Sequence, residues 1–219
     1  MSEYDIKSMT LPEIKSVMRE LGQPEFRAGQ IYQWLQVHGA MDYSEMTNIS
    51  KQLREALREK YPIRYCEIEL KQVSKIDGTV KYLFRLCDGN FIESVLMKYK
   101  YGYTLCISSQ VGCKMGCVFC ASTKSGCVRS LFPSEMIGQI HAAQRDMNIR
   151  VSHVVMMGMG EPLDNLDEVL KALELLTATY GYAWSPKRIT LSTVGLRKGL
   201  QRFIEENDCH LAISLHSPL

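Results

Sequence analysis

Hydrophobic residues in the first third of the chain recur at the three- and four-residue spacing of amphipathic helices. Thr10 and Glu13 form a capping box, which predicts a helix that begins after Thr10 and ends near Leu21. The same spacing predicts two more helices, over residues 26–37 and 50–61, and the second of these stops before a proline. This part of the chain is therefore predicted to be a small helical unit.

The middle of the chain alternates apolar and polar residues with the two-residue period of β-strands. Strands are predicted over residues 68–73, 80–86 and 91–97. Asp77-Gly78 and Asp88-Gly89 lie between them, and Asp-Gly pairs favour the tight turns of hairpins. The pattern predicts a β-meander that leads into the segment that follows.

Strands and helices alternate in the last part of the chain. Helices are predicted over 134–147, 165–180 and 196–206, and strands over 151–157, 188–193 and 210–215. Asn165, with Glu168 three residues later, is expected to cap the second of these helices. The alternation predicts an α/β fold with a parallel sheet, in which the loops that follow the strands face one ligand space. These strands alone would leave a hydrophobic sheet edge open, so we expect the chain to be part of a longer protein.

Composition narrows the function only slightly. The 219 residues are 46% hydrophobic and 23% charged, which is typical of a packed globular protein. No apolar run reaches membrane-spanning length, and the first residues lack the profile of a signal peptide, so a cytoplasmic protein without a membrane partner is predicted. The formal net charge of +2 neither favours nor excludes nucleic acid, whose binding would depend on a local basic surface.

The cysteines are the strongest chemical signal. Five of the eight lie close together, which in a cytosolic chain indicates metal binding or chemistry rather than disulfides. Cys113, Cys117 and Cys120 are spaced as three thiolate ligands of a [4Fe–4S] cubane, and the fourth iron would be free to chelate the amino and carboxylate groups of a substrate. The alternative is zinc, with Cys127 or Cys106 as fourth ligand, but a single CxxxCxxC without a second CxxC pair favours the cluster.

A glycine-rich loop follows the predicted strand 151–157. Its sequence is Gly158-Met-Gly-Glu-Pro162. Glycines at this place let the backbone approach a ligand, and Glu161 can lie near the ammonium group of that ligand. Such a loop alone is weak evidence, but beside the cysteine motif it becomes a strong indication of a binding site.

Together these motifs resemble those of radical SAM enzymes, and within them the adenine carbon-2 methyltransferases of 23S rRNA and tRNA (the RlmN family). The resemblance covers essentially the whole chain and is carried by residues 92–95, 106–113, 117–120, 154–162, 189–193 and 211–216. It implies a helical accessory domain of RNA-binding type over residues 1–64 and a β-meander linker over 65–104. Residues 105–219 would be the first part of an incomplete radical SAM β/α barrel.

The resemblance also implies roles for particular residues. The [4Fe–4S] ligands would be Cys113, Cys117 and Cys120, and the contacts of S-adenosylmethionine (SAM) would be Gly160, Glu161, Ser192, Ser214, Leu215 and His216. Glu93 would accept a proton, and Cys106 would resolve a covalent protein–RNA adduct by forming a disulfide. Taken alone, Glu93 is more simply a solvated strand carboxylate and Cys106 a small buried hydrophobic residue. The implied partners are 23S rRNA, tRNA and an electron donor such as a flavodoxin-type reductant.

The methyl-carrying cysteine of the family and a further SAM-contacting asparagine belong to a C-terminal part with no counterpart in these residues. The chain by itself is therefore expected to be inactive in methyl transfer. Three alternatives stay open: an adenine carbon-8 rRNA methyltransferase (the Cfr type), a radical SAM activase or peptide-modifying enzyme, and a non-catalytic fragment that binds cluster and RNA. Gln110-Val-Gly112 and the glycine-rich loop favour carbon 2, and the helical first domain disfavours the activase.

Overall fold

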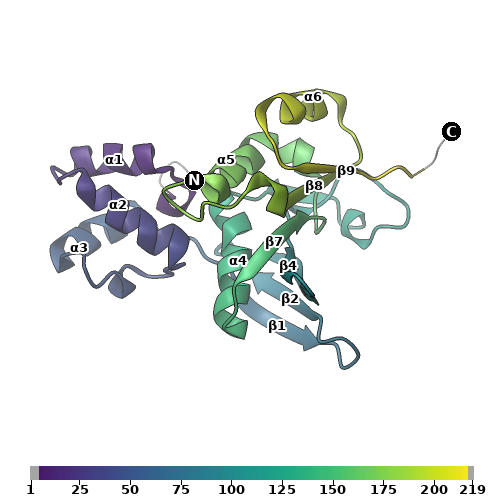
Figure 1. Cartoon of the computed structure of the whole chain (residues 1–219), viewed down its shortest axis with the longest axis horizontal. Coiled ribbons are helices and arrows are strands. Elements are labelled where there is room, and N and C mark those ends of the chain that lie inside the picture. Colours follow the sequence, from purple (N-terminus) through teal and green to yellow (C-terminus); the bar gives the residue numbers. More distant parts are fainter. Residues whose placement is uncertain (1–4, 217–219) are drawn as a thin grey trace.

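The computed structural model describes residues 5–216, and its N-terminal part is a cluster of short helices (Figure 1). They are η1 (Ile6–Ser8), α1 (Leu11–Glu20), α2 (Phe26–Tyr32), the π-helical η2 (Gln33–Val37), η3 (Tyr43–Glu45) and α3 (Lys51–Lys60). All three predicted helices are confirmed. The second is continuous over the expected range but widens to π geometry after Tyr32.

Local capping explains where these helices begin. The backbone N–H of Thr10 donates to Glu13 Oε2 at 2.6 Å, and the hydroxyl of Thr10 donates to the same oxygen at 3.0 Å. Ser50 Oγ accepts from the N–H of Leu53 at the start of α3. Both contacts satisfy polar groups at a helix N-terminus, where no intrahelical partner exists.

A seven-stranded sheet forms the centre of the rest of the chain (Figure 1). Its strands, in spatial order, are β1 (Glu67–Val73), β2 (Val80–Arg85), β3 (Phe91–Tyr99), β4 (Gly102–Cys106), β7 (Val151–Met156), β8 (Ile189–Thr193) and β9 (His210–Ile213). Strands β1 to β4 pair antiparallel, and β4, β7, β8 and β9 pair parallel. The meander and the parallel part therefore form one continuous sheet through β4, a strand that sequence patterning did not single out. The predicted domain boundaries at residues 64 and 104 stay predictions.

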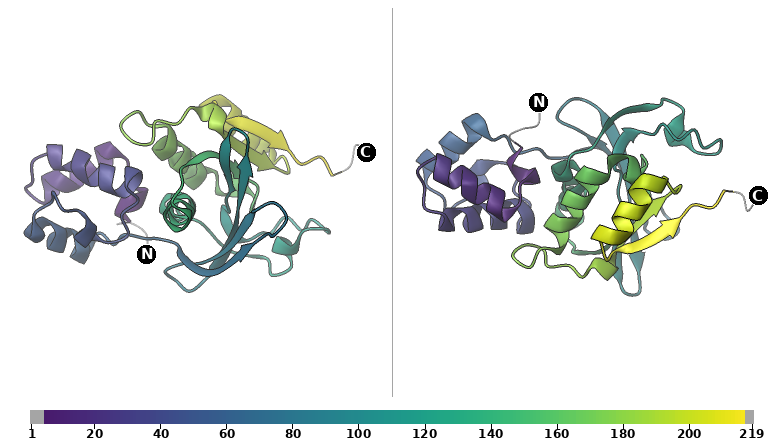
Figure 2. Two further views of the ribbon diagram at one scale, coloured as in Figure 1. Left: turned by 60° about the horizontal axis from the view of Figure 1, so that its bottom comes forward. Right: turned by 90° about the horizontal axis from the view of Figure 1, so that it is seen from above.

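Helices cover one face of this sheet (Figure 2). They are α4 (Pro133–Met147), α5 (Leu166–Thr177) and α6 (Arg197–Glu206), with the short turns η5 (Pro162–Asn165) and η6 (Pro186–Arg188) beside them. Tyr82, Leu105 and Leu191 are fully buried on the covered face. Because side chains alternate along a strand, Glu93, Cys106 and Ser192 project from the opposite face, and all three are half-buried. We call this second face the open face.

Most predicted elements of this part are confirmed, but one cap is wrong. Helix α5 begins beside Asn165, yet the Asn165 side chain does not cap it. Its amide instead donates to the carbonyls of Ser109 (3.0 Å) and Leu131 (2.9 Å), because the buried loops beneath it need donors. In residues 5–216 we find no helix with the length and hydropathy needed to cross a membrane.

Candidate active site

The cysteine motif lies in a loop between two short strands, β5 (Gln110–Gly112) and β6 (Cys127–Ser130), which pair with each other. The N–H of Cys113 donates to the carbonyl of Gly126 at 2.9 Å, and this bond closes the base of the loop. The N–H of Cys120 donates to the carbonyl of Cys117 at 3.0 Å, which folds the motif into a turn. All three thiols are free, with Cys113 buried and the other two half-buried.

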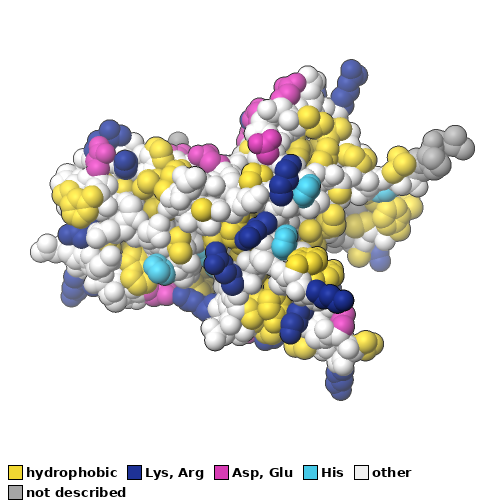
Figure 3. Space-filling model, in the orientation of Figure 1, with side chains coloured by type: hydrophobic (Ala, Val, Ile, Leu, Met, Phe, Trp, Pro, Cys, Tyr) yellow, Lys and Arg dark blue, Asp and Glu magenta, His cyan; other side chains and the backbone are white. Residues whose placement is uncertain are grey.

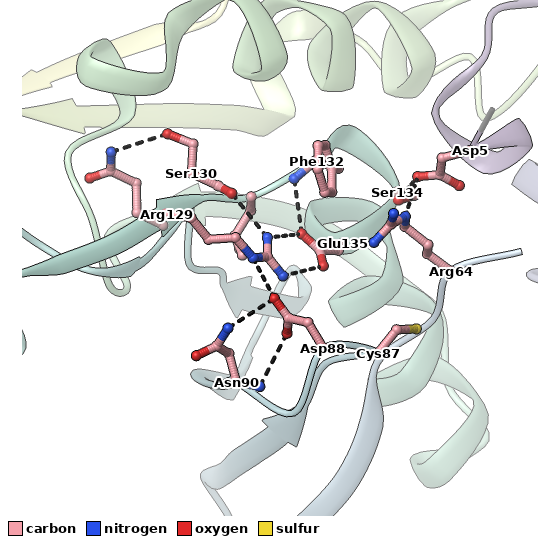
Figure 4. Close-up of polar contacts among 12 residues, drawn as sticks. Asp5, Arg64, Cys87, Asp88, Asn90, Arg129, Ser130, Phe132, Ser134 and Glu135 are labelled. Atoms are coloured by element: carbon pink, nitrogen blue, oxygen red, sulfur yellow. Dashed lines mark hydrogen bonds and ion pairs between the residues drawn. The ribbon is translucent and has the colours of Figure 1, made fainter. Parts of the chain in front are cut away.

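Arg129 anchors the second stem of this loop (Figure 4). Its guanidinium donates two hydrogen bonds of 2.8 Å to the two carboxylate oxygens of Glu135, at the start of α4. A third bond of 2.6 Å reaches Asp88, in the turn between β2 and β3, and holds the pKa of that carboxyl well below its usual value. Since the Glu135 side chain is only 1% exposed, this forked pair is largely shielded from water.

The glycine-rich loop packs directly against the strand that leads into the cysteine motif. The N–H groups of Ser109 and Gln110 donate to the carbonyl of Met159 at 2.8 and 3.2 Å. Gly160 has a φ of +100°, and a Cβ there would come within 2.6 Å of the Gln110 side chain. Only glycine satisfies both the backbone conformation and this close approach.

Glu161 is buried, with 3% exposure, and its carboxylate is fully engaged by the protein. Oε1 accepts from the hydroxyl of Thr193 at 2.6 Å and from the N–H of Leu163 at 3.0 Å. Oε2 accepts from the N–H of Val194 at 3.0 Å. Glu161 therefore ties the loop after β7 to the end of β8, a role that motif analysis did not foresee.

One cleft of about 300 Å³ brings the predicted site residues together. It is lined by Cys113, Cys117, Cys120, Gly160, Glu161, Ser192, Ser214 and His216. The hydroxyls of Ser192 and Ser214 lie 3.3 Å apart, and the ring of Phe119 packs edge-on against His216 with centroids 4.8 Å apart. Leu215 is 74% exposed and is not among the lining residues. Its predicted contact with SAM, like the other contacts, stays a prediction.

Sequence reasoning missed the apolar walls of this cleft. Met115, Phe119, Met156 and Met157 line it together with the polar residues. Met157 directly follows β7, so the rule that ligands lie at the carboxyl ends of parallel strands would have indicated it. Phe119 lies inside the cysteine motif itself and gave no such signal.

Cys106 and Glu93 lie outside the cleft lining but on the same open face. The thiol of Cys106 accepts from the N–H of Met157, a cleft residue, while burial raises the pKa of this thiol. Cys106 pairs with Val95 across β3 and β4, so Glu93 lies two residues along the same face. Lys81 Nζ lies 2.7 Å from Glu93 Oε1. The structure thus groups both residues beside the cleft, while their roles stay predictions.

The donor set of the cleft suits an iron–sulfur cluster. Burial raises the pKa of Cys113, and the neighbouring thiols of Cys120 and Cys117 raise it further because thiolates repel one another. A cationic iron centre would relieve that repulsion, and three thiolates leave one iron of a cubane open. Within residues 5–216, no three His, Cys, Asp or Glu side chains converge closely enough to hold a single metal ion.

Comparison with known proteins agrees with this geometry. The model of the radical SAM superfamily matches residues 107–219, more than half of the chain. The chain belongs to the radical SAM superfamily. The cofactors of this superfamily are a [4Fe–4S] cluster and SAM, so the cofactor prediction is confirmed. A second model, the ribosomal RNA large subunit methyltransferase N-terminal domain, matches residues 4–63.

Individual relatives confirm the predicted resemblance. A probable dual-specificity RNA methyltransferase RlmN of Bacteroides thetaiotaomicron is 54% identical over 100% of this chain and 63% of its own length. A protein of the same name from Lachnoclostridium phytofermentans is 49% identical over 99% of the chain and 61% of its own length. The crystal structure of a radical SAM methyltransferase from Sphaerobacter thermophilus is 38% identical, with a TM-score of 0.91, over 98% of this chain and 64% of that one. This radical SAM chain thus spans about three fifths of the length of its relatives.

Proposed function

We propose that this chain is part of a cytoplasmic radical SAM methyltransferase that methylates carbon 2 of adenine in 23S rRNA and tRNA. The cleft supports this most directly, because it joins three free thiols to the strand-end residues expected to contact SAM. The names of the relatives, dual-specificity RNA methyltransferases, support the substrate class. Carbon 2 of adenine is not nucleophilic, so ordinary methyl transfer fails and radical chemistry is needed.

Different residues of the cleft would bind the cluster and SAM. Cys113, Cys117 and Cys120 would hold the cluster, which when bound supplies the one-electron reduction that cleaves SAM. Ser192 and Ser214, whose hydroxyls face each other across β8 and the end of β9, would hydrogen-bond the polar groups of SAM. The apolar side chains of the cleft would exclude water from the reacting atoms.

Two residues of the open face would act on the RNA adenine, one as a proton acceptor and one in releasing the covalent adduct. Glu93 would accept the proton that adenine loses, and Lys81 orients this carboxylate from 2.7 Å. Cys106 would form an S–S bond with the sulfur of the protein–RNA adduct while the S–C bond breaks, and the freed electron pair takes up a proton to complete the methyl group on the base. Burial raises the pKa of the Cys106 thiol, and the N–H of Met157 offsets only part of this effect, so the attacking thiolate forms less readily than it does from an exposed cysteine.

The test is anaerobic reconstitution followed by product analysis. We expect about four irons and four sulfides per chain, as for a three-thiolate cubane, and loss of the cluster in Cys117→Ala. A full-length enzyme that contains this chain, given SAM, a flavodoxin-type reductant and RNA, should yield 2-methyladenosine after digestion. Formation of 8-methyladenosine would assign the chain to the carbon-8 branch. Stoichiometric zinc without iron–sulfur absorption would overturn the proposal.

A further inference from the structure

The turn that connects β3 to β4 exposes two stacked tyrosines at the edge of the open face. Tyr99 is 45% exposed and Tyr101 63%, and their rings are nearly parallel, with centroids 5.2 Å apart. The ring of Tyr101 also packs edge-on against His153 of β7, with centroids 4.9 Å apart. We refer to residues 98–103 as the tyrosine turn. Its aromatic rings are held in place by one another yet remain accessible.

Tyr99 lies on the same face of the sheet as the proposed catalytic residues. It is four residues along β3 from Val95, which pairs with Cys106. Residues separated by an even number along a strand share a face, so Tyr99 and Cys106 both project from the open face. At roughly 3.3 Å per strand residue, the two positions are separated by about 13 Å. A nucleic acid strand at Cys106 would therefore reach the tyrosine turn within a few nucleotides.

Positive charge surrounds this turn. Lys100 belongs to it, Lys98 lies on the side of the covered face with its Nζ 6.0 Å from the ring centroid of Tyr103, and Arg150 directly precedes β7. Burial, followed by the positive charge of Arg188, lowers the pKa of His153. In the space-filling view, Lys, Arg and His side chains lie among hydrophobic ones over the lower right part of the molecule, where β1 to β4 lie and acidic side chains are few (Figure 3).

The sequence explains how a nearly neutral chain carries such a surface. Residues 94–134, which include the tyrosine turn and the cysteine motif, contain five Lys or Arg residues and no Asp or Glu. Residues 175–204, which include β8 and most of α6, again contain five Lys or Arg and no Asp or Glu. The net charge of +2 for the whole chain thus hides two long segments that are exclusively basic, although Lys114, Arg129 and Arg202 within them pair with carboxylates of other segments.

We propose that the tyrosine turn, together with His153, binds unpaired RNA at the edge of the open face opposite the cleft, about 13 Å from Cys106. This inference rests on the proposed function, which makes RNA the substrate, and it locates a contact surface for it. Exposed aromatic rings stack with bases irrespective of sequence, and neighbouring lysines contact the phosphates. An adenine that is to be modified must leave its stack, so its neighbours need a surface that holds them unpaired. A row of tyrosines flanked by cations meets that need.

RNA-binding titrations of the cluster-loaded chain test this inference. The probes are a fluorescein-labelled stem-loop RNA with an unpaired adenine in its loop and a fully paired duplex of equal length. We expect the double variant Tyr99→Ala/Tyr101→Ala to bind the stem-loop roughly tenfold more weakly, because each stacked base loses its aromatic partner. Its affinity for the duplex should change little. Tyr99→Phe/Tyr101→Phe should bind as the unaltered chain does, since phenylalanine still stacks.

Contacts between lysine and phosphates are measured separately, through the salt dependence of RNA binding. Each phosphate contact in single-stranded nucleic acid contributes about 0.7 to the slope of log affinity against log salt concentration. Lys100→Ala should therefore lower this slope by about 0.7. The matched control is Lys75→Ala, which removes an exposed lysine of the neighbouring turn between β1 and β2. We expect the control to leave both affinity and slope unchanged.

The outcomes separate this inference from the proposed function. Unchanged stem-loop affinity in the tyrosine variant, with RNA still bound, would overturn the inference and leave the methyltransferase proposal intact. Equal losses for stem-loop and duplex would show a general electrostatic surface and would also overturn it. A change in oligomeric state with no change in RNA affinity would assign the turn to contacts between copies. If the unaltered chain bound neither RNA, the inference would be overturned, and product analysis with the longer enzyme would decide the substrate class separately.

Discussion

Glu161 shows how a residue chosen from a ligand-binding motif can act through the protein instead. Its two oxygens accept three hydrogen bonds, from Leu163, Thr193 and Val194, that join two strand ends. In Glu161→Gln an amide NH₂ would replace one acceptor, and two donors would meet without a partner. We expect a loss of about 1–3 kcal/mol in stability.

The same change should weaken SAM binding, because the strand ends that form the cleft would separate. Calorimetric titration with SAM and urea unfolding measure the two effects. The matched control is Glu205→Gln, an exposed carboxylate on α6, which should change neither. SAM affinity that stays constant while stability falls would limit Glu161 to a purely structural role.

His141 predicts a dependence of stability on pH. It is buried, its Nε2–H donates to the carbonyl of Gln36 at 2.9 Å, and burial and then Lys7 hold its pKa well below the ordinary value. Because the folded pKa is lowered, the unfolded chain binds the proton first as pH falls through about 6.5. The free energy of unfolding should therefore be constant above this pH with respect to His141. At lower pH it should decrease by up to about 1.4 kcal/mol per pH unit.

Urea unfolding at pH 7.5 and 5.5 measures this effect. His141→Gln keeps a donor for Gln36 but cannot titrate, so its stability should change between these pH values by about 1 kcal/mol less than that of the unaltered chain. The control is His38→Gln, because His38 is exposed. Identical pH dependence in His141→Gln and the unaltered chain would contradict the assignment.

At the scale of elements, the hairpin of β5 and β6 depends on Arg129. Arg129→Met would leave the Glu135 carboxylate buried without its forked partner, which typically costs about 3–5 kcal/mol. The second stem of the cysteine loop would then detach from α4, so the chain should take up less iron on reconstitution. Iron content and thermal unfolding measure both consequences.

Arg202→Met is the matched comparison for that change. Arg202 also binds two carboxylates, Glu206 and Asp167, but all three side chains are largely exposed. Exposed ion pairs contribute about 0–1 kcal/mol, so this variant should keep its cluster and most of its stability. Equal effects of the two substitutions would contradict the importance assigned to burial of the Arg129–Glu135 pair.

At the scale of the whole molecule, cleavage of SAM should occur without methyl transfer to RNA. The cleft is complete enough in residues 5–216 to bring the three thiols and the strand ends together, so the reduced, cluster-loaded chain should convert SAM to 5′-deoxyadenosine. It should form no 2-methyladenosine, because the methyl-carrying cysteine of the family has no counterpart in these residues. Without that covalent nucleophile the pathway of methyl transfer is abolished outright. Chromatography of the digested RNA and of the small molecules measures both. Methylated adenosine from this chain alone would show that another cysteine, such as Cys127 or Cys209, carries the methyl group.

Local chemistry explains what could be determined from the sequence alone. The helix at Thr10, the hairpin turns and the alternation of strands and helices depend on contacts within a few residues, so periodicity and capping predicted them. The spacing of Cys113, Cys117 and Cys120 likewise lies within one loop. The misassigned cap at Asn165 marks the limit, since its partners, Ser109 and Leu131, are 56 and 34 residues away.

Strand register decided the rest. It places Glu93, Cys106 and His153 on one face and brings Thr193 to the carboxylate of Glu161. Shifting a strand by one residue would move each of these side chains to the other face of the sheet. That register depends on pairing between distant segments and on the burial of one face under α4, α5 and α6. The sequence by itself therefore determined the elements and the cluster motif, whereas the tertiary structure determined which side chains meet around the cleft.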